Sequence, residues 1–283
     1  MAPGGENIMT RVKDKLHSLG VKPSKTRGQN FLIDESVLDA IFAAGRMTVD
    51  DNVVEIGPGL GALTKLIYNL KPHTAIEIES QFCKKLSEDY PNLKLVNEDV
   101  RKVDFSQFGR ELLVYGNLPY SFSTEIIFHL AEFRPYIKRS VFLLQKEFAE
   151  RMAAPPGGKD YGVLSISVQT NFSTSLGREV SGNCFHPPTK VTSKIIVLEP
   201  LVKPLVPVEK QAWFKKTVKA CFLQRRKKLP NSIKAASLIP VADPLDLIRD
   251  ACQKVDIDPN RRAETLSIEE FAKLADSLSQ IAT

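Results

Sequence analysis

Short apolar runs alternate with longer segments of mixed character over the first two thirds of the chain. Runs rich in Val, Ile and Leu, four to eight residues long, are typical of buried strands. Strands are expected near residues 53–56, 74–78, 93–96, 112–115, 140–144, 175–180 and 193–198. The mixed segments between the earlier strands have helical periodicity, and a helix is expected before them, over about 35–44. Strands that alternate with helices predict an α/β fold, with a parallel sheet covered on both faces.

The pattern changes after residue 200. Three prolines indicate a linker there: Pro200, Pro204 and Pro207. Helices are expected beyond the linker, over residues 211–229, 244–254 and 267–279. The last of them starts at Ser267, and Glu270 stands at the spacing of a capping box. The sequence therefore predicts a second, small all-α domain.

A glycine turn, from Glu55 to Gly61, follows the first expected strand and precedes a helical pattern. Strand, glycine turn and helix allow the backbone to approach a nucleotide-like ligand closely. Glycine is needed because a side chain would fill the ligand's space. Gly57, Gly59 and Ala62 also fit the dinucleotide fingerprint, so a nicotinamide or flavin enzyme is an alternative.

Acidic residues near the strand ends favour S-adenosylmethionine over a dinucleotide. Glu55 stands before the first glycine, and Glu77 follows Gly57 by about twenty residues, suited to ribose hydroxyls. The second feature is shared with NAD enzymes. The next strand leads to Asp99, which could accept from an adenine amine. An Asp at this place is also typical of a helix N-cap or a turn.

Asn117-Leu118-Pro119-Tyr120 is the most specific stretch, and it follows an apolar strand. The Asn oxygen and nearby backbone carbonyls can accept both hydrogens of an exocyclic amine. Proline stiffens those carbonyls, and Tyr offers a flat face to a base. Such acceptors direct the nitrogen lone pair at an electrophile without a general base. Asn and Pro also occur in ordinary turns, but the four motifs in this order favour methyl transfer to a base amine.

The chain resembles the small-subunit ribosomal RNA adenine N6,N6-dimethyltransferases, which modify two adjacent adenosines near the 3′ end of that RNA. The resemblance runs from Lys25 to about Leu274. Beyond the core motifs it includes residues 28–32, 144–147, 161–165, 185–191, 224–229 and 262–267. It implies a basic N-terminal arm (1–30), a Rossmann-like S-adenosylmethionine-dependent methyltransferase domain (31–200) and a helical RNA-binding domain (201–283).

The resemblance also implies roles for individual residues. Cofactor-binding residues are expected at Asn30, Leu32, Gly57, Glu77, Asp99 and Asn117. Catalytic residues are expected at Asn117, Leu118, Pro119, Tyr120 and Phe185, with Tyr120 and Phe185 clamping the target adenine. Glu79 competes with Glu77 as the ribose ligand, because alternation along a strand points both the same way. The family alignment favours Glu77.

One position departs from the family pattern. Thr189 stands where the family usually has the last of three prolines. The segment Phe185-His186-Pro187 is also similar to the macrolide-resistance methyltransferases, which act on large-subunit RNA. The sequence therefore leaves open which ribosomal RNA is the substrate. The expected methyl transfer is the same for both groups of enzymes.

Charge is concentrated in two segments, although the net charge of the chain is only +6. Residues 1–30 carry six Lys or Arg against two acids, and residues 201–234 carry ten against one. Backbone phosphates are the natural partner of such segments. RNA-binding residues are expected at Lys22, Lys25, Arg27, Arg225, Arg226, Lys227 and Lys228. A solvated helix face is the alternative for the last four, and an anionic membrane is a weaker one.

Other features exclude several classes of protein. No stretch approaches the roughly 18 apolar residues of a membrane span, and no signal-like run opens the chain. The four Cys and four His are scattered without metal-ligand spacing, so no metal is expected. The expected protein is a cytoplasmic monomer whose partners are the small ribosomal subunit and its RNA. Two alternatives stay open: an enzyme acting on large-subunit RNA, and a non-catalytic assembly or transcription factor with this fold.

Overall fold

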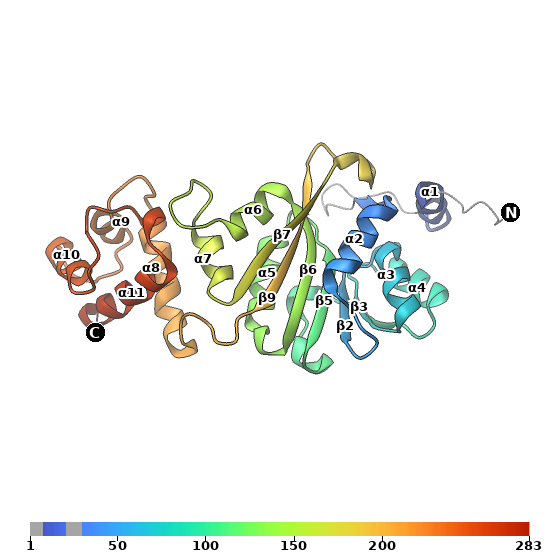
Figure 1. Ribbon diagram of the computed structural model, residues 1–283, viewed down its shortest axis with the longest axis horizontal. Coiled ribbons are helices and arrows are strands. Elements are labelled where there is room, and N and C mark those ends of the chain that lie inside the picture. Colours follow the sequence, from blue (N-terminus) through green and yellow to red (C-terminus); the bar gives the residue numbers. More distant parts are fainter. Residues whose placement is uncertain (1–7, 21–29, 283) are drawn as a thin grey trace. The chain divides into compact units, whose positions relative to one another are not determined.

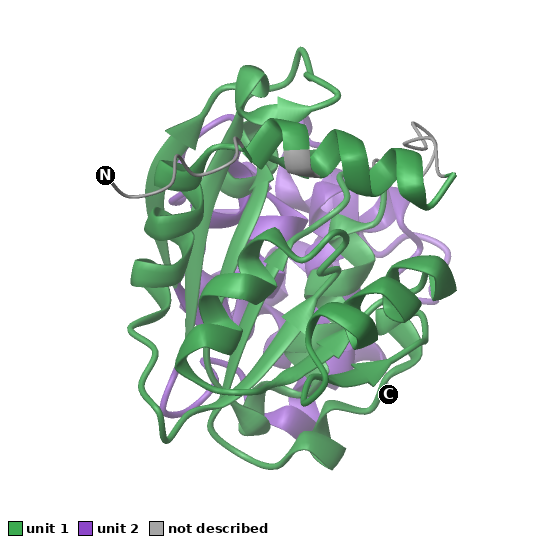
Figure 2. Ribbon diagram, turned by 90° about the vertical axis from the view of Figure 1, so that its right-hand side faces the viewer, with its two compact units in different colours: residues 1–149, 174–200 green, residues 150–173, 201–283 purple. Residues whose placement is uncertain are grey.

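The computed structural model describes residues 8–20 and 30–282 (Figure 1). The chain forms two compact units, coloured separately in Figure 2. Unit 1 comprises residues 1–149 and 174–200, and unit 2 comprises residues 150–173 and 201–283.

The centre of unit 1 is a seven-stranded sheet in the order β4-β3-β2-β5-β6-β9-β7 (Figure 1). Its strands are β2 (Asn52–Ile56), β3 (Thr74–Ile76), β4 (Lys94–Val96), β5 (Leu112–Asn117), β6 (Ile137–Gln145), β7 (Phe172–Val180) and β9 (Ser193–Pro200). Neighbouring strands from β4 to β6 are parallel, and β9 runs antiparallel to β6. The α/β fold and the seven expected strand segments are confirmed.

Helices follow the strands of unit 1 as the periodicity predicts. They are α2 (Glu35–Gly45), α3 (Ala62–Leu70), α4 (Ser80–Asp89) and α5 (Ser123–Glu132), with short 3₁₀ turns η1 (Val100–Lys102), η2 (Phe105–Phe108), η3 (Arg134–Tyr136) and η4 (Gly182–Cys184). The Asp34 side chain caps α2 by accepting from the backbone N–H of Val37. Apolar residues of α2 and α3, such as Ile41 and Ile67, share a buried cluster with Leu113. These two helices therefore cover one face of the sheet.

The expected basic arm contains a helix that the sequence analysis missed, α1 (Ile8–Ser18). Val12 and Leu16 are buried and pack in one cluster with Phe31, Leu60 and Phe82. Their spacing of four residues, which puts them on one helical face, is the signal that could have revealed α1. Lys22, Lys25 and Arg27 lie outside the described residues.

Unit 2 is helical. It contains the second half of α6 (Lys146–Ala153), together with α7 (Val163–Gln169), α8 (Gln211–Phe222), α9 (Leu229–Ala235), α10 (Leu245–Gln253) and α11 (Ile268–Ala282), and the 3₁₀ turns η5 (Val208–Lys210) and η6 (Ala263–Thr265). Ser267 and Glu270 form the expected capping box, because each side chain accepts from the other's backbone N–H. Residues 150–173 fall in this unit rather than with the rest of the 31–200 segment. The physical reason is their core: Tyr161 and Ile166 are buried in one cluster with Phe271.

The basic run does not lie on a helix, which corrects the expectation of a helix over 211–229. Helix α8 ends at Phe222, and residues 223–227 form turns and a bend before α9 begins at Leu229. Pro230 stands in the first turn of α9, a position that tolerates proline because no helical hydrogen bond is lost there.

Candidate active site

A cavity of about 1120 Å³ opens in unit 1 at the carboxyl ends of the parallel strands. Segments that follow neighbouring parallel strands meet at this edge, where α/β proteins bind their ligands. Every expected cofactor-binding and catalytic residue lines the cavity: Asn30, Leu32, Gly57, Glu77, Asp99, Asn117, Leu118, Pro119, Tyr120 and Phe185. The structure therefore brings together residues that are spread over more than half of the chain.

The glycine turn forms one wall through its backbone. Gly57 has a φ of 66°, a left-handed conformation that favours glycine. A side chain at Gly57 would start in open space, because no atom lies within 4 Å of its Cβ position. The wall is thus free of side-chain bulk at Gly57.

Glu77 lies behind this loop, with an exposed fraction of only 5%. Its Oε2 accepts from the backbone N–H of Gly59 at 3.0 Å, and its Oε1 accepts from that of Glu79 at 2.9 Å. Burial raises the pKa of Glu77 to about 7. Glu79 also lines the cavity, but it precedes the first turn of α4 and is half-buried.

Asp99 follows β4 and forms an ion pair with Arg101. Arg101 Nε lies 3.0 Å from Oδ1 of Asp99, and Arg101 Nη2 lies 2.5 Å from Oδ2. The Arg101 hydrogen bonds lower the pKa of Asp99. The Asp99 side chain also caps η1, as the N-cap alternative foresaw. The guanidinium of Arg101 lies 4.6 Å from the centre of the Phe122 ring, so Arg101 connects Asp99 to the segment after Tyr120.

Asn117 and Leu118 both line the cavity, and each carries a hydrogen-bond acceptor. Asn117 Nδ2 donates to the backbone carbonyl of Asn30 at 3.3 Å, which leaves Oδ1 as the acceptor of that amide. Among the described residues, no donor reaches the carbonyl oxygen of Leu118. The Pro119 carbonyl is already used, because it accepts from the Phe122 N–H and the Ser123 hydroxyl. The Leu118 carbonyl, unlike that of Pro119, therefore keeps its acceptor capacity with respect to the described residues.

Two aromatic rings belong to the same cavity. Tyr120 is half-buried, and its hydroxyl lies 2.6 Å from Oγ of Ser193. Phe185 has an exposed fraction of only 2% and forms part of the wall. It is held by a two-stranded ribbon in which β1 (Phe31–Leu32) pairs with β8 (Phe185–His186). Leu32 stands opposite Phe185 in this ribbon, which joins two segments that the sequence analysis named separately.

A family model described as "Ribosomal RNA adenine dimethylase" matches residues 21–280. The chain belongs to this family. It is 38% identical to the ribosomal RNA small subunit methyltransferase A of Clostridium botulinum over 95% of this chain and 98% of that protein. It is 40% identical to the protein of the same name from Syntrophotalea carbinolica, over 90% of this chain and 96% of that one.

Solved structures agree with this assignment. The dimethyladenosine transferase of Plasmodium falciparum superposes with a TM-score of 0.76 at 28% identity, covering 88% of this chain and 98% of that one. The 23S rRNA methyltransferase ErmE superposes with a TM-score of 0.67 at 24% identity, covering 89% of this chain and all of that one, and shows the shared fold. The family of rRNA adenine dimethylases uses S-adenosylmethionine.

Thr189, which departs from the usual proline of the family, has its own structural role. Its backbone N–H donates to the carbonyl of Gly182, a bond that proline could not form. Its hydroxyl oxygen accepts from the N–H of Val191. A Cβ on Gly182 would lie 1.8 Å from the Thr189 carbonyl oxygen, so this close approach requires glycine. The loop after Phe185 is thus closed by hydrogen bonds in place of a third proline.

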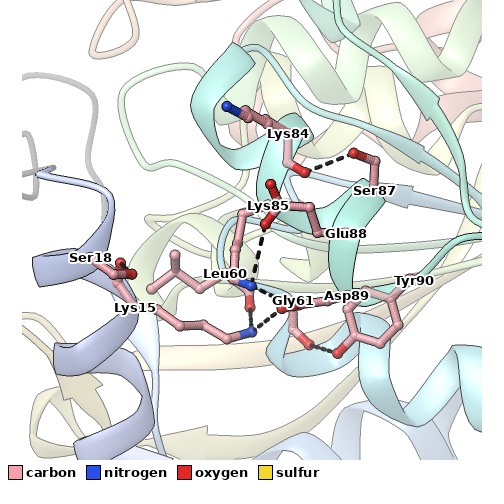
Figure 3. A network of polar contacts seen from close by, with 10 residues as sticks. All are labelled: Lys15, Ser18, Leu60, Gly61, Lys84, Lys85, Ser87, Glu88, Asp89 and Tyr90. Atoms are coloured by element: carbon pink, nitrogen blue, oxygen red, sulfur yellow. Dashed lines mark hydrogen bonds and ion pairs between the residues drawn. The ribbon is translucent and has the colours of Figure 1, made fainter.

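Helix α1 contacts the glycine turn through Lys15, as Figure 3 shows. Lys15 Nζ donates to the carbonyl of Leu60 at 3.2 Å and to Oδ2 of Asp89 at 2.7 Å. Asp89 also pairs with Lys85, and the Tyr90 hydroxyl lies 3.4 Å from the Gly61 carbonyl. Ile8, Val12 and Lys15 line the cavity, so α1 forms a wall that was not foreseen.

Ile78 is a further cavity residue that the sequence analysis missed. It lies between Glu77 and Glu79 and has an exposed fraction of 58%. An apolar residue between two acids at the end of an expected strand is the sequence signal that could have identified it. Its surface suits the flat face of a base.

The expected RNA-binding residues of unit 2 differ in whether their side chains have partners within the protein. Arg225 Nε donates to Glu264 at 2.8 Å, and its Nη2 donates to the carbonyl of Gly158 at 3.1 Å. Lys228 is exposed and donates to Asn260. Arg226 and Lys227 are exposed, and neither side chain has a partner among the described residues. Of these four side chains, Arg226 and Lys227 thus carry charges that no described residue pairs with.

Residues 8–20 and 30–282 contain no group of three or more His, Cys, Asp or Glu that could hold a metal ion. Within the same ranges, no helix is both long and apolar enough to cross a membrane.

Proposed function

We propose that the protein transfers methyl groups from S-adenosylmethionine to N6 of two adjacent adenosines near the 3′ end of small-subunit ribosomal RNA. Membership of the adenine dimethylase family supports this function. So does the name of its relatives, ribosomal RNA small subunit methyltransferase A. The observation that carries the proposal is the pair of acceptors, Asn117 Oδ1 and the Leu118 carbonyl, on the cavity that Glu77 and Asp99 also line.

The residues of the cavity suit S-adenosylmethionine, which supplies a methyl group on a positively charged sulfur. Glu77 would take the ribose hydroxyls and Asp99 the adenine amine, while the turn from Gly57 to Gly61 would accommodate the amino-acid end. Asn30 and Leu32 complete the binding surface. The open direction at Gly57 and the two carboxylates on one cavity fit a ligand of this shape and polarity.

The chain acts on the target amine by orientation. Asn117 Oδ1 and the Leu118 carbonyl would accept the two N6 hydrogens and so direct the nitrogen lone pair towards the methyl group that the cofactor would supply. No general base is needed, because the methylated nitrogen is acidic and loses its proton to water. The Tyr120 hydroxyl does not serve as a base: it is paired with Ser193, and burial raises its pKa.

The target adenosine must leave its stack to reach the cavity. Tyr120 and Phe185 are proposed to hold it, and each stacking contact contributes about 1–3 kcal/mol. Because Phe185 is part of the wall, Tyr120 offers the larger accessible ring.

The RNA outside the cavity is proposed to contact the basic segments. Arg226 and Lys227 contribute from unit 2, and Lys22, Lys25 and Arg27 from the arm, each through phosphate. The partner in this proposal is the small ribosomal subunit, bound by a monomer in the cytoplasm.

The test uses two separate reactions. Each contains the protein and labelled S-adenosylmethionine, with undermethylated small subunits in one and large-subunit RNA in the other. The modified nucleotides are then mapped. The proposal expects dimethylation of two adjacent adenosines in the small subunit alone. A modified adenosine in large-subunit RNA would favour the alternative, an enzyme that acts on large-subunit RNA. Normal binding to small subunits without any methylation would favour the non-catalytic assembly factor.

A further inference from the structure

Ser193 lies at the start of β9 and is completely buried. It stands opposite Gln145 of β6 in the sheet, and the neighbouring Thr192 carbonyl accepts from the N–H of Lys146 at 2.9 Å. The backbone on which Ser193 stands is therefore fixed by the sheet. The same backbone is the end of the loop that begins with Phe185.

The Ser193 hydroxyl has one side-chain partner among the described residues, the hydroxyl of Tyr120, at 2.6 Å. The two residues are 73 positions apart. A Tyr ring that is half-buried at a cavity has several staggered orientations available. A hydrogen bond from its distal end to a rigid strand selects one of them. Because both partners are hydroxyls, the contact orients the ring without placing a charge beside the cavity.

We propose that Ser193 is a positioning residue that holds the Tyr120 ring in the orientation in which it stacks on the target adenine. This inference rests on the proposed function. It assigns to Ser193 a role in base binding that acts through Tyr120 alone. It also means that the loop carrying Phe185 and the segment carrying Asn117 are joined at the base site by one hydrogen bond.

The test is a double-mutant cycle with Ser193→Ala, Tyr120→Phe and the double variant. Removing either hydroxyl breaks the same contact and keeps the aromatic ring. Each single variant is expected to lower kcat/KM for the RNA by about three- to tenfold, the range for one neutral hydrogen bond. The double variant is expected to fall no further than the singles. The dissociation constant of S-adenosylmethionine stays within about twofold of the wild-type value, because no cofactor contact is changed.

The matched control is Ser140→Ala, which removes another buried Ser hydroxyl of the same sheet. It should leave kcat/KM unchanged. Thermal unfolding of every variant separates a general loss of stability from a loss confined to RNA turnover. If Ser193→Ala does not fold, Tyr120→Phe still removes the contact, because it leaves Ser193 in place.

Two results would overturn the inference. One is wild-type kcat/KM for Tyr120→Phe, which would show that the hydroxyl contact has no role in turnover. The other is a double variant whose loss is the product of the two single losses, because independent effects multiply. The failure of the proposed function looks different: the wild-type protein itself would then methylate no adenosine of the small subunit.

Discussion

The side-chain nitrogen of Asn117 donates to the backbone carbonyl of Asn30 at 3.3 Å, although the residues are 87 positions apart. This contact decides which end of the Asn117 amide is left to accept a hydrogen bond. It also joins the segment before β1 to the end of β5. The orientation of Asn117 is therefore set by the fold.

Glu77 gives a prediction that separates it from Glu79. At pH 8, where Glu77 is mostly ionised, Glu77→Ala should raise the dissociation constant of S-adenosylmethionine by about one to a few powers of ten, because hydrogen bonds to a charged group contribute about 1.5–3 kcal/mol each. Glu79→Ala should change it much less. Titration calorimetry on both variants measures this. Unchanged affinity in Glu77→Ala together with a large loss in Glu79→Ala would move the ribose contact to Glu79.

The pKa of Glu77, about 7 in the folded protein against an ordinary 4.5, makes a prediction about pH. Between these values the folded protein holds a proton that the unfolded chain has lost, so the Glu77 contribution lowers stability as the pH rises through this window. The shift corresponds to about 3 kcal/mol. Because Gln does not titrate, the stability of Glu77→Gln relative to the wild type should therefore rise between pH 4.5 and pH 8, as measured by the two urea midpoints at each pH. An equal difference at both pH values would contradict a protonated Glu77.

From the contacts of Lys15 with the glycine turn and with Asp89, we expect α1 to stabilise the proposed cofactor site. Lys15→Met removes the bonds to the Leu60 carbonyl and to Asp89 while it keeps the apolar stem. The affinity for S-adenosylmethionine should fall by about two- to fivefold, in the range for a partly exposed charged contact. Lys13→Met, an exposed position on the same helix, is the control. If both variants bound the cofactor equally well, the contact of α1 with the glycine turn would have no part in binding.

The basic run of unit 2 predicts two different phenotypes. Arg226→Ala and Lys227→Ala should each weaken binding to small subunits and reduce the salt slope by about 0.7–0.9 per lost phosphate contact. Arg225→Ala should instead lower the melting temperature, because it leaves Glu264 without its partner. Binding measured at several salt concentrations, together with thermal unfolding, distinguishes the two effects. A reduced salt slope without loss of stability in Arg225→Ala would place Arg225 on the RNA.

Much of the fold and of the cavity could be predicted from the sequence because their signals are local. Apolar runs mark buried strands, and the parallel order then brings Gly57, Glu77, Asp99 and Asn117 to one edge. Contacts between distant residues have no such signal. Arg225 pairs with Glu264, which is 39 positions away. A count of charges along the sequence treats every residue of the basic run alike, so it cannot show this pairing. The grouping of residues 150–173 with unit 2 is missed for the same reason, since it depends on where Tyr161 is buried.

The most direct test of the central claim is methylation of small subunits by Asn117→Ala, with Asn30→Ala as the matched control. Asn30→Ala keeps the backbone carbonyl that orients Asn117, whereas Asn117→Ala removes the acceptor for the target amine. Asn117→Ala should abolish dimethylation of the two adenosines and weaken S-adenosylmethionine binding only in part, while Asn30→Ala should retain turnover at saturating cofactor. Near-normal dimethylation by Asn117→Ala would contradict the account.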